Sequence, residues 1–356
     1  MNGDRHKNQS GRMIAAWLDS SSRALAARAM SRLTGQLESP DEISPYSFNE
    51  LTFEAEQRLR CLAEALFVSR PELCVMDLEW IRAAMNARGI PPTLLTRMLA
   101  VLRAELMESL PAERRGEVIG LFDYAHTELL KKASFELESA IDKERPHIAA
   151  AREFLLHVLE GNQRAALDLV DRMAADSVPV QEIHRHVLAP VLQELGRMWL
   201  LGEAGIAEEH VGSRTVEEAL VRLRRYASPR PSNGKTALVA SVEGNLHDIG
   251  ARMVGDQLEF RGWRVIFLGQ SVPAADIAMA AVVYKADVVA LSAGTIQHVR
   301  PAARAVDHIR TSGSQAKILV GGGPFAALRD LYEDVGADAG AVDALGALQA
   351  AEAITA

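Results

Sequence analysis

The residues with the most distinctive chemistry lie in one short loop, at positions 243–250. This loop contains His247 and lies between an apolar, β-branched run and an amphipathic run. The pattern predicts a strand at 236–242 and a helix from about 249, so the loop follows the carboxyl end of a strand, where open α/β sheets bind ligands. Imidazole is a good ligand for cobalt-like transition metals. The alternative is a surface histidine with no ligand.

The spacing of further motifs argues against an isolated surface histidine. The pattern is Asn245-x-His247-x-x-Gly250, then after 41 residues Ser292-x-Gly294, then after 26 more Gly321-Gly322. It resembles the cobalamin-binding domain of methionine synthase, the corrinoid proteins and the mutases, whose pattern is Asp-x-His-x-x-Gly, Ser-x-Leu and Gly-Gly. The resemblance implies that His247 ligates cobalt from the lower face. It also implies that the nucleotide tail is displaced into the α/β domain.

The same resemblance implies a set of cofactor-binding positions in this domain. They are Asn245, His247, Gly250, Ser292, Thr295, Gly321 and Gly322. Two positions depart from the family pattern. Asn245 replaces the aspartate, and we expect it to hydrogen-bond the second ring nitrogen of His247 without carrying a charge. Gly294 replaces the leucine, and we expect it to leave more room near the tail. The glycines after the fourth strand should let a ligand approach the backbone.

A second constellation lies upstream, where Trp199 is followed after nine residues by Glu209 and His210. A core tryptophan and a solvated Glu-His pair are the plain alternative. The stretch resembles the helical bundle of CarH-type adenosylcobalamin photoreceptors, which carry a Trp-x9-Glu-His motif. The resemblance implies that these three residues, with Ile206, shelter the adenosyl group on the upper face of the corrin. Leu200 departs from the histidine that often follows this tryptophan and ligates cobalt after photolysis.

Composition limits the class of protein. The chain has 356 residues, enough for two or three domains, and its formal charge of −8 argues against a nucleic-acid surface. Two cysteines, Cys61 and Cys74, imply no disulfide framework, and small buried hydrophobes are favoured over bilin attachment points. Apolar runs of 18 residues and a signal-peptide core are both absent. These features predict a soluble, cytoplasmic protein that does not bind a membrane.

The hydrophobic pattern divides the chain into three parts. Residues 1–145 predict an all-α domain whose last helix runs from 112 to about 144, and residues 146–227 predict a four-helix bundle. After a Pro- and Ser-containing linker, residues 235–356 predict five βα units. The fold class is therefore α plus α/β, ending in a Rossmann-like doubly wound parallel sheet. A dinucleotide site is the competing interpretation, but no G-x-G-x-x-G follows the first strand.

The order of these parts is similar to that of the photocobilins. In that family a globin-like helical domain precedes a CarH-like module and binds a bilin, biliverdin, beside the cobalamin. The resemblance implies a light sensor that uses adenosylcobalamin and biliverdin, and that changes its packing or oligomeric state when light breaks the cobalt–carbon bond. A helical dimerisation domain without a ligand is the alternative for residues 1–145.

Motifs of catalysis are missing from the sequence. It shows no nucleophile elbow, P-loop, kinase or cyclase motif, so we expect no enzymatic activity. Output would then pass through a homo-oligomer with light-dependent assembly, or through an effector protein or domain. The rival function is a corrinoid methyl carrier of a methyltransferase system, which must expose its cobalt to a partner enzyme. A cobalamin-level sensor without photochemistry is a third possibility.

Overall fold

The computed structural model describes residues 2–37, 43, 46–131, 137–228 and 230–356. The chain divides into two compact units, residues 1–137 and 138–356. Within the described residues, no helix has both the length and the apolarity needed to cross a membrane.

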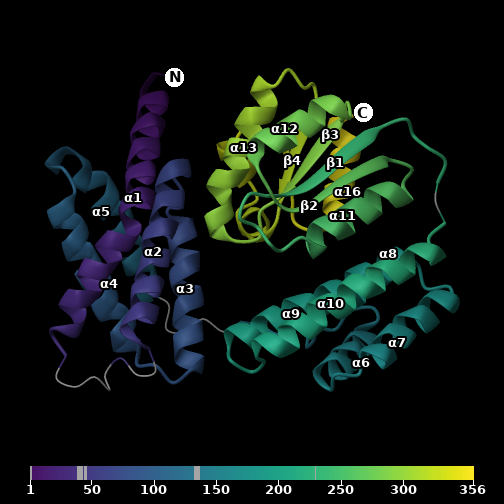
Figure 1. The fold of residues 1–356 in the computed structure, drawn as a ribbon, viewed down its shortest axis with the longest axis horizontal. Coiled ribbons are helices and arrows are strands. Elements are labelled where there is room, and N and C mark those ends of the chain that lie inside the picture. The colour runs from purple at the N-terminus through teal and green to yellow at the C-terminus, as the bar shows by residue number, and fades with distance from the viewer. Residues whose placement is uncertain (1, 38–42, 44–45, 132–136, 229) are drawn as a thin grey trace. The chain divides into compact units, whose positions relative to one another are not determined.

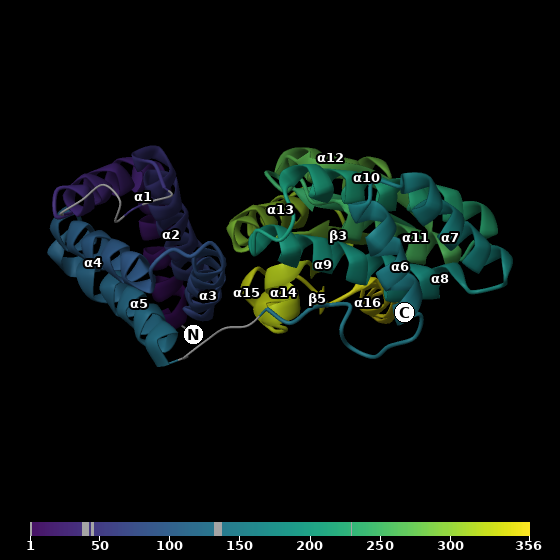
Figure 2. The same ribbon diagram turned by 90° about the horizontal axis from the view of Figure 1, so that it is seen from below.

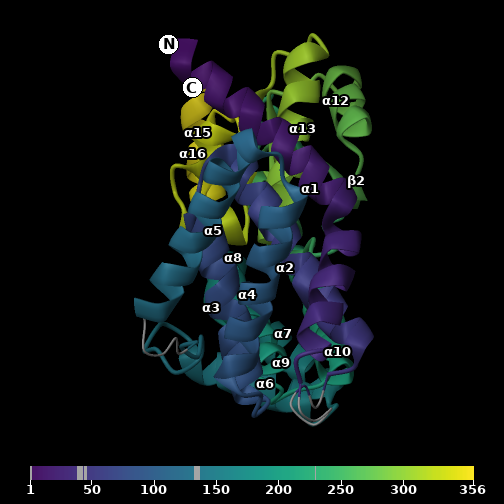
Figure 3. The same cartoon turned by 90° about the vertical axis from the view of Figure 1, so that its left-hand side faces the viewer.

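The first unit is built from helices, as its pattern predicted. They are α1 (Asn2–Thr34), α2 (Phe48–Val68), α3 (Glu72–Ala87), α4 (Pro92–Ser109) and α5 (Ala112–Lys131). Helix α1 packs on α2 and α4, and Figure 3 shows α4 and α5 on the near side of this unit. Its core is rich in fully buried leucines such as Leu18, Leu62 and Leu102. Ser47 begins α2 with a capping box that it forms with Glu50.

The prediction that the last of these helices runs to about residue 144 is wrong. The described residues 137–147 form turns and irregular backbone. Glu194, which is 3 % exposed, explains part of this difference. Its Oε2 accepts hydrogen bonds from the Ser139 hydroxyl at 3.0 Å and from the Ala140 backbone N–H at 2.7 Å. A backbone N–H that bonds a distant carboxylate cannot also serve a helix.

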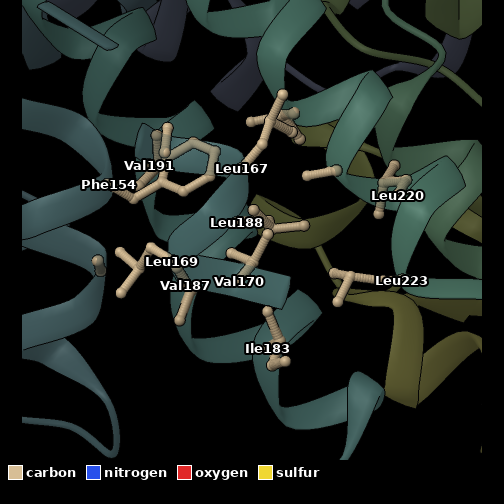
Figure 4. Packing of buried hydrophobic residues seen from close by; sticks show 14 of the residues in the cluster. Phe154, Leu167, Leu169, Val170, Ile183, Val187, Leu188, Val191, Leu220 and Leu223 are labelled. Carbon is tan, nitrogen blue, oxygen red and sulfur yellow. The ribbon is translucent and has the colours of Figure 1, made fainter. Parts of the chain in front are cut away.

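The second unit begins with helices, in the region where the sequence predicted a four-helix bundle. Its helices are α6 (Ile148–Leu159), α7 (Gln163–Ala175), α8 (Val180–Ile183), α9 (Ala189–Leu200) and α10 (Ile206–Leu223). A π-helical turn, His184–Leu188, joins α8 to α9, and a 3₁₀ turn, Arg224–Tyr226, extends α10. Phe154, Leu188 and Leu223 point into one core (Figure 4). Burying each such side chain contributes about 1.5–3 kcal/mol.

The π-helical turn has a local cause. Pro190 lacks a backbone N–H, and its ring would collide with the carbonyl group four residues earlier in a regular helix. The chain accommodates this proline by inserting a wider turn just before it, in which the Ala189 N–H bonds the His184 carbonyl oxygen.

The predicted parallel sheet of five strands is confirmed, with order β2-β1-β3-β4-β5. Its strands are β1 (Thr236–Val242), β2 (Arg264–Val272), β3 (Val288–Ser292), β4 (Lys317–Gly321) and β5 (Ala339–Ala341). Its helices are α11 (Ile249–Phe260), α12 (Ala274–Val283), α13 (Val299–Thr311), α14 (Gly323–Ala327), α15 (Leu331–Asp334) and α16 (Ala344–Ile354). They cover both faces of the sheet (Figures 1 and 2). Every residue of β1 is buried, which explains its continuous apolar run.

Helix α11 connects the sheet to the bundle. Its Met253 and Phe260 belong to the same apolar cluster as the bundle core. Arg224, at the end of the bundle, forms ion pairs with Glu259 and with the buried Asp256 of α11. The bundle and the sheet therefore share both apolar and charged contacts along one helix.

Candidate functional site

Three loops meet at the carboxyl edge of the sheet. In the strand register Ser292 of β3 pairs with Ser241 of β1 and with Gly321 of β4. The structure thus brings together all seven positions expected in this domain: Asn245, His247, Gly250, Ser292, Thr295, Gly321 and Gly322. His247 is exposed in the loop between β1 and α11. Neighbouring parallel strands bring these distant motifs to one edge because their carboxyl ends coincide there.

Asn245 organises the loop that carries His247. It is fully buried, its Oδ1 accepts a hydrogen bond from the His247 backbone N–H at 3.1 Å, and its Nδ2 donates to the Ser292 carbonyl at 3.0 Å. The expected hydrogen bond to the His247 ring is therefore wrong in the described structure. The side chain is short and lies within a tight turn, where the backbone groups are the nearest partners. Asn245 ties the histidine loop to β3.

The expectation that Gly294 opens space near the tail is also wrong. A Cβ atom at Gly294 would lie 2.8 Å from Oδ1 of Asn245 and 3.4 Å from Cβ of His247. The space is already filled by the histidine loop, so glycine is needed for packing within the protein. Gly322 has a φ of 109°, and a Cβ atom there would lie 2.1 Å from the Ala293 carbonyl oxygen. Gly322 is therefore needed because the protein's own backbone packs closely against it.

His298 is a residue of this edge that the sequence analysis missed. Its Nδ1 accepts a hydrogen bond from the Thr295 backbone N–H at 3.1 Å. Burial lowers the pKa of His298, and a hydrogen bond to the Gly244 backbone opposes that effect. The ring of His298 therefore links the loop after β3 to the loop that holds His247. The capping pattern Thr295-x-x-His298 was the available sequence signal.

A cavity of about 1190 Å³ opens at this edge and runs along one face of the sheet. Ser292, Gly321 and Gly322 line it at the edge. Small and apolar residues of the strands and of α11 and α16 line its wall, including Val239, Ala290, Leu319, Ala347 and Leu348. The volume exceeds the usual small-molecule range of about 300–1,000 Å³. It suits a long ligand tail.

The second expected group lies where α9 connects to α10. Trp199 is 43 % exposed and Ile206 is 65 % exposed, so the plain interpretation of a core tryptophan does not hold. Oε2 of Glu209 lies 2.8 Å from Nδ1 of His210, and its Oε1 accepts a hydrogen bond from Ser213 at 2.6 Å. Leu200, where a histidine is common in the family, is buried at 8 % exposure.

One face of α10 is turned toward the histidine loop. Burial and then Glu217 raise the pKa of Asp248, while Arg214 lowers it. Both residues of α10 are thus close enough to Asp248 to act on its charge. His210, Arg214 and Glu217 are spaced by four and three residues, which places them on one side of a helix. The exposed end of the bundle and the metal-ligand candidate therefore face the same region.

These features fit a corrinoid cofactor. A corrinoid would bring most of the ligands of its own cobalt, so one exposed histidine at the sheet edge, His247, would be enough to hold the metal from the protein side. The cavity between the sheet, α11 and α16 fits the nucleotide tail.

Comparison with known families agrees with this geometry. Residues 235–351 match the model of the B12 binding domain, and residues 150–224 match a second B12 binding domain model. The second unit therefore consists largely of domains that bind cobalamin. The chain is a cobalamin-binding protein by class, and the CarA and CarH repressors are among its relatives.

Two curated relatives are repressors from Myxococcus xanthus. The chain is 30 % identical over 169 residues to the HTH-type transcriptional repressor CarA and 34 % identical over 151 residues to the HTH-type transcriptional repressor CarH. These matches cover 46 % and 42 % of this chain, and 54 % and 49 % of the two repressors. The chain thus spans about half the length of these relatives.

Corrinoid proteins match as well. Corrinoid protein DSY3155 of Desulfitobacterium hafniense is 24 % identical over 204 residues, which is 55 % of this chain and 93 % of that protein. The solved structure of the Methanosarcina barkeri monomethylamine corrinoid protein superposes with a TM-score of 0.52 at 21 % identity, covering 58 % of this chain and 99 % of that one. This likeness shows a shared fold.

Proposed function

We propose that the chain is a light-sensing photoreceptor that binds adenosylcobalamin, with His247 as the lower ligand of the cobalt. The observation that carries the proposal is the set of exposed residues where α9 connects to α10, namely Trp199 and Ile206 together with the Glu209–His210 pair, which we call the cap. Adenosylcobalamin would supply a cobalt–carbon bond that visible light breaks. An upper ligand as large as adenosyl would cover apolar surface that is otherwise wet.

Each residue of the cap has a distinct task. The indole of Trp199 packs over the flat adenine, and Ile206 covers the apolar side of the same group. Glu209 accepts hydrogen bonds from hydroxyl groups and holds the orientation of His210 through Nδ1. Because the cap is on the bundle and His247 is on the sheet domain, loss of the upper ligand changes how these two parts pack. The signal then passes through a homo-oligomer or an effector.

The first unit is proposed to bind biliverdin in a globin-like arrangement. Phe53 and Trp80, on α2 and α3, are 58 % and 51 % exposed. Exposed aromatic side chains suit a long apolar tetrapyrrole, and a cationic group at the site would pair with its propionates. A dimerisation surface is the alternative use of the same side chains.

A corrinoid methyl carrier is the second candidate function. Corrinoid protein DSY3155 matches over 93 % of its length, whereas the repressors match over about half of theirs. Identity favours the repressors, at 30–34 % against 24 % for DSY3155. The cap favours the photoreceptor, because a methyl carrier must present its cobalt to a partner enzyme and gains nothing from shielding a bulky group.

The proposal is tested by spectroscopy on protein assembled in the dark with adenosylcobalamin and biliverdin. Green light should convert the cobalamin spectrum and change the oligomeric state, and a far-red band of bound biliverdin should shift at the same time. Trp199→Ala should weaken adenosylcobalamin at least tenfold while leaving hydroxocobalamin within about twofold, because only the first presents an adenosyl surface.

Three outcomes would contradict parts of the proposal. Equal losses for both cobalamins in Trp199→Ala would make the tryptophan structural. Methylcobalamin bound as tightly as adenosylcobalamin, with methyl transfer to a thiol acceptor, would favour the carrier. A biliverdin spectrum that is the same with the protein as in buffer would favour the alternative, in which the first unit is a dimerisation domain. Phe154→Leu, deep in the bundle core, is the control for general loosening of the bundle.

A further inference from the structure

His184 is a buried histidine that the proposed cobalt site does not use. It begins the π-helical turn before Pro190 and is 2 % exposed. Neither ring nitrogen has a hydrogen-bond partner among the residues that the structure describes. Buried polar groups nearly always have partners, and π-helical turns are frequent at functional sites. The histidine is therefore placed to serve a ligand.

The surroundings of His184 are apolar. Its ring lies against Phe260, the last residue of α11, with ring centroids 6.1 Å apart and an interplanar angle of 45°. Burial lowers the pKa of His184 to about 4. The ring is thus neutral at physiological pH, with one nitrogen that donates a hydrogen bond and one that accepts.

His184 lines the same cavity that opens at Ser292 and Gly321. Helix α11 forms one wall from Gly250 to Phe260, and a helix rises about 1.5 Å per residue, so the wall is about 15 Å long. A ligand that enters at the sheet edge and follows α11 inward therefore reaches His184. Between these points the strand residues Val239 and Ala290 offer apolar side chains.

We propose that His184 donates a hydrogen bond to the heterocyclic base at the end of the nucleotide tail of a bound corrinoid. The inference rests on the proposed cobalamin binding. When His247 takes the axial position, the base nitrogen that would otherwise bind cobalt is left as an acceptor without a partner. A neutral imidazole supplies the missing donor, and Phe260 supplies an aromatic edge for the flat base. The bundle thereby recognises the tail.

The test compares two corrinoids that differ in the tail. Hydroxocobalamin carries the nucleotide and diaquocobinamide lacks it, and both are titrated into the full-length apo-protein. His184→Leu should weaken hydroxocobalamin about tenfold, the loss expected for one buried hydrogen bond, and leave cobinamide within about twofold. His184→Gln retains a donor and should lose less than His184→Leu.

Val187→Ala is the matched control. Val187 lies in the same π-helical turn and is fully buried in the bundle core, but it does not line the cavity. It should affect both corrinoids equally. Equal losses for both corrinoids in His184→Leu and His184→Gln would overturn the inference and make His184 structural, and so would no loss for either.

Wild-type binding separates this inference from the proposed function. Wild-type protein that binds neither corrinoid contradicts the cobalamin proposal itself. If the wild-type protein binds both corrinoids equally, cobalamin binding stands. The nucleotide tail then contributes nothing to the affinity, and the inference about His184 is overturned. Circular dichroism shows whether His184→Leu folds. If it does not, the affinities of His184→Gln for the two corrinoids are compared with those of Val187→Ala instead.

Discussion

Gly294 has no room for a side chain, because the loop that carries His247 fills the space beside it. In Gly294→Ala the new Cβ would press on Asn245 Oδ1 at 2.8 Å and displace the loop that carries His247. We expect a loss of about 1–3 kcal/mol in the free energy of unfolding of the second unit, as for overpacking, together with weaker corrinoid binding. Urea unfolding and corrinoid titration measure the two effects.

Gly196→Ala is the control for this substitution. A Cβ atom at Gly196, within α9, has no heavy atom within 4 Å, so alanine should leave the stability unchanged or raise it slightly. The prediction would be contradicted if Gly294→Ala were as stable as Gly196→Ala and bound the corrinoid with wild-type affinity. The loop that carries His247 would then accommodate the extra methyl group with no loss of stability.

Helix α11 and the end of α10 are joined by a charge interaction that depends on pH. Arg224 pairs with Asp256, whose pKa is raised to about 7 by burial and lowered in part by Arg224. Arg224→Gln should therefore cost about 1–2 kcal/mol in the unfolding free energy at pH 8, where Asp256 is charged. The cost should be smaller at pH 5.5, where Asp256 holds a proton.

Two further variants check this prediction. Arg261→Gln removes a charge that lies 3.9 Å from an exposed glutamate, and its effect should not change with pH. Arg224→Gln combined with Asp256→Asn should recover the stability at pH 8, because no buried charge is left uncompensated. A cost of Arg224→Gln that is equal at both pH values would contradict the role of Asp256.

The second unit as a whole contains two buried groups, His184 and Asp256, whose titrations have opposite effects on the free energy of unfolding. Folded His184, with a pKa of about 4, stays neutral while its unfolded form binds a proton below pH 6.5, so stability falls as pH falls through that window. Folded Asp256, with a pKa of about 7, holds a proton that its unfolded form lacks above pH 3.8, so stability rises as pH falls. The two slopes largely cancel between pH 6.5 and 4.

Asp256→Asn should expose the contribution of His184. In this variant the free energy of unfolding should decrease by about 1.4 kcal/mol per pH unit between pH 6.5 and 5. Hydrogen exchange of the β1 amides, followed as a function of urea, reports the second unit alone. A variant whose slope matches that of the wild type would show that His184 finds a partner or water when it is charged.

Much of the fold could be predicted from local pattern. The apolar run at 236–242 forms a strand that is buried on both faces of the sheet, as its continuous apolar pattern predicts. The alternation of strands and helices predicts that this strand belongs to a parallel sheet of five strands, which the structure has. Helices are present throughout the region predicted to form the bundle, but the helical stretch 180–200 is interrupted by the π-helical turn His184–Leu188. The end of α5 was missed because residues 139–140 bond Glu194, which lies more than 50 positions away.

The candidate site, like the fold, could be predicted from the sequence only in part. The spacing of its motifs was enough to place His247, Ser292 and Gly321 at one edge, since parallel strands of similar length end together. The use of each side chain was not predictable. Asn245 was assigned to the His247 ring, yet it bonds backbone groups of two loops. His298 carried no signal beyond a capping pattern.

By itself the sequence determined the periodicity, the element types and the order of the motifs, because these depend on residues within one or two turns of each other. The tertiary structure alone decided which atoms meet. Gly294 is needed because the loop after β1 lies against it, and His184 lies against an aromatic ring because α11 brings Phe260 beside it. Burial, partner choice and pKa follow from segments that pack together in space, and a linear pattern does not contain that information.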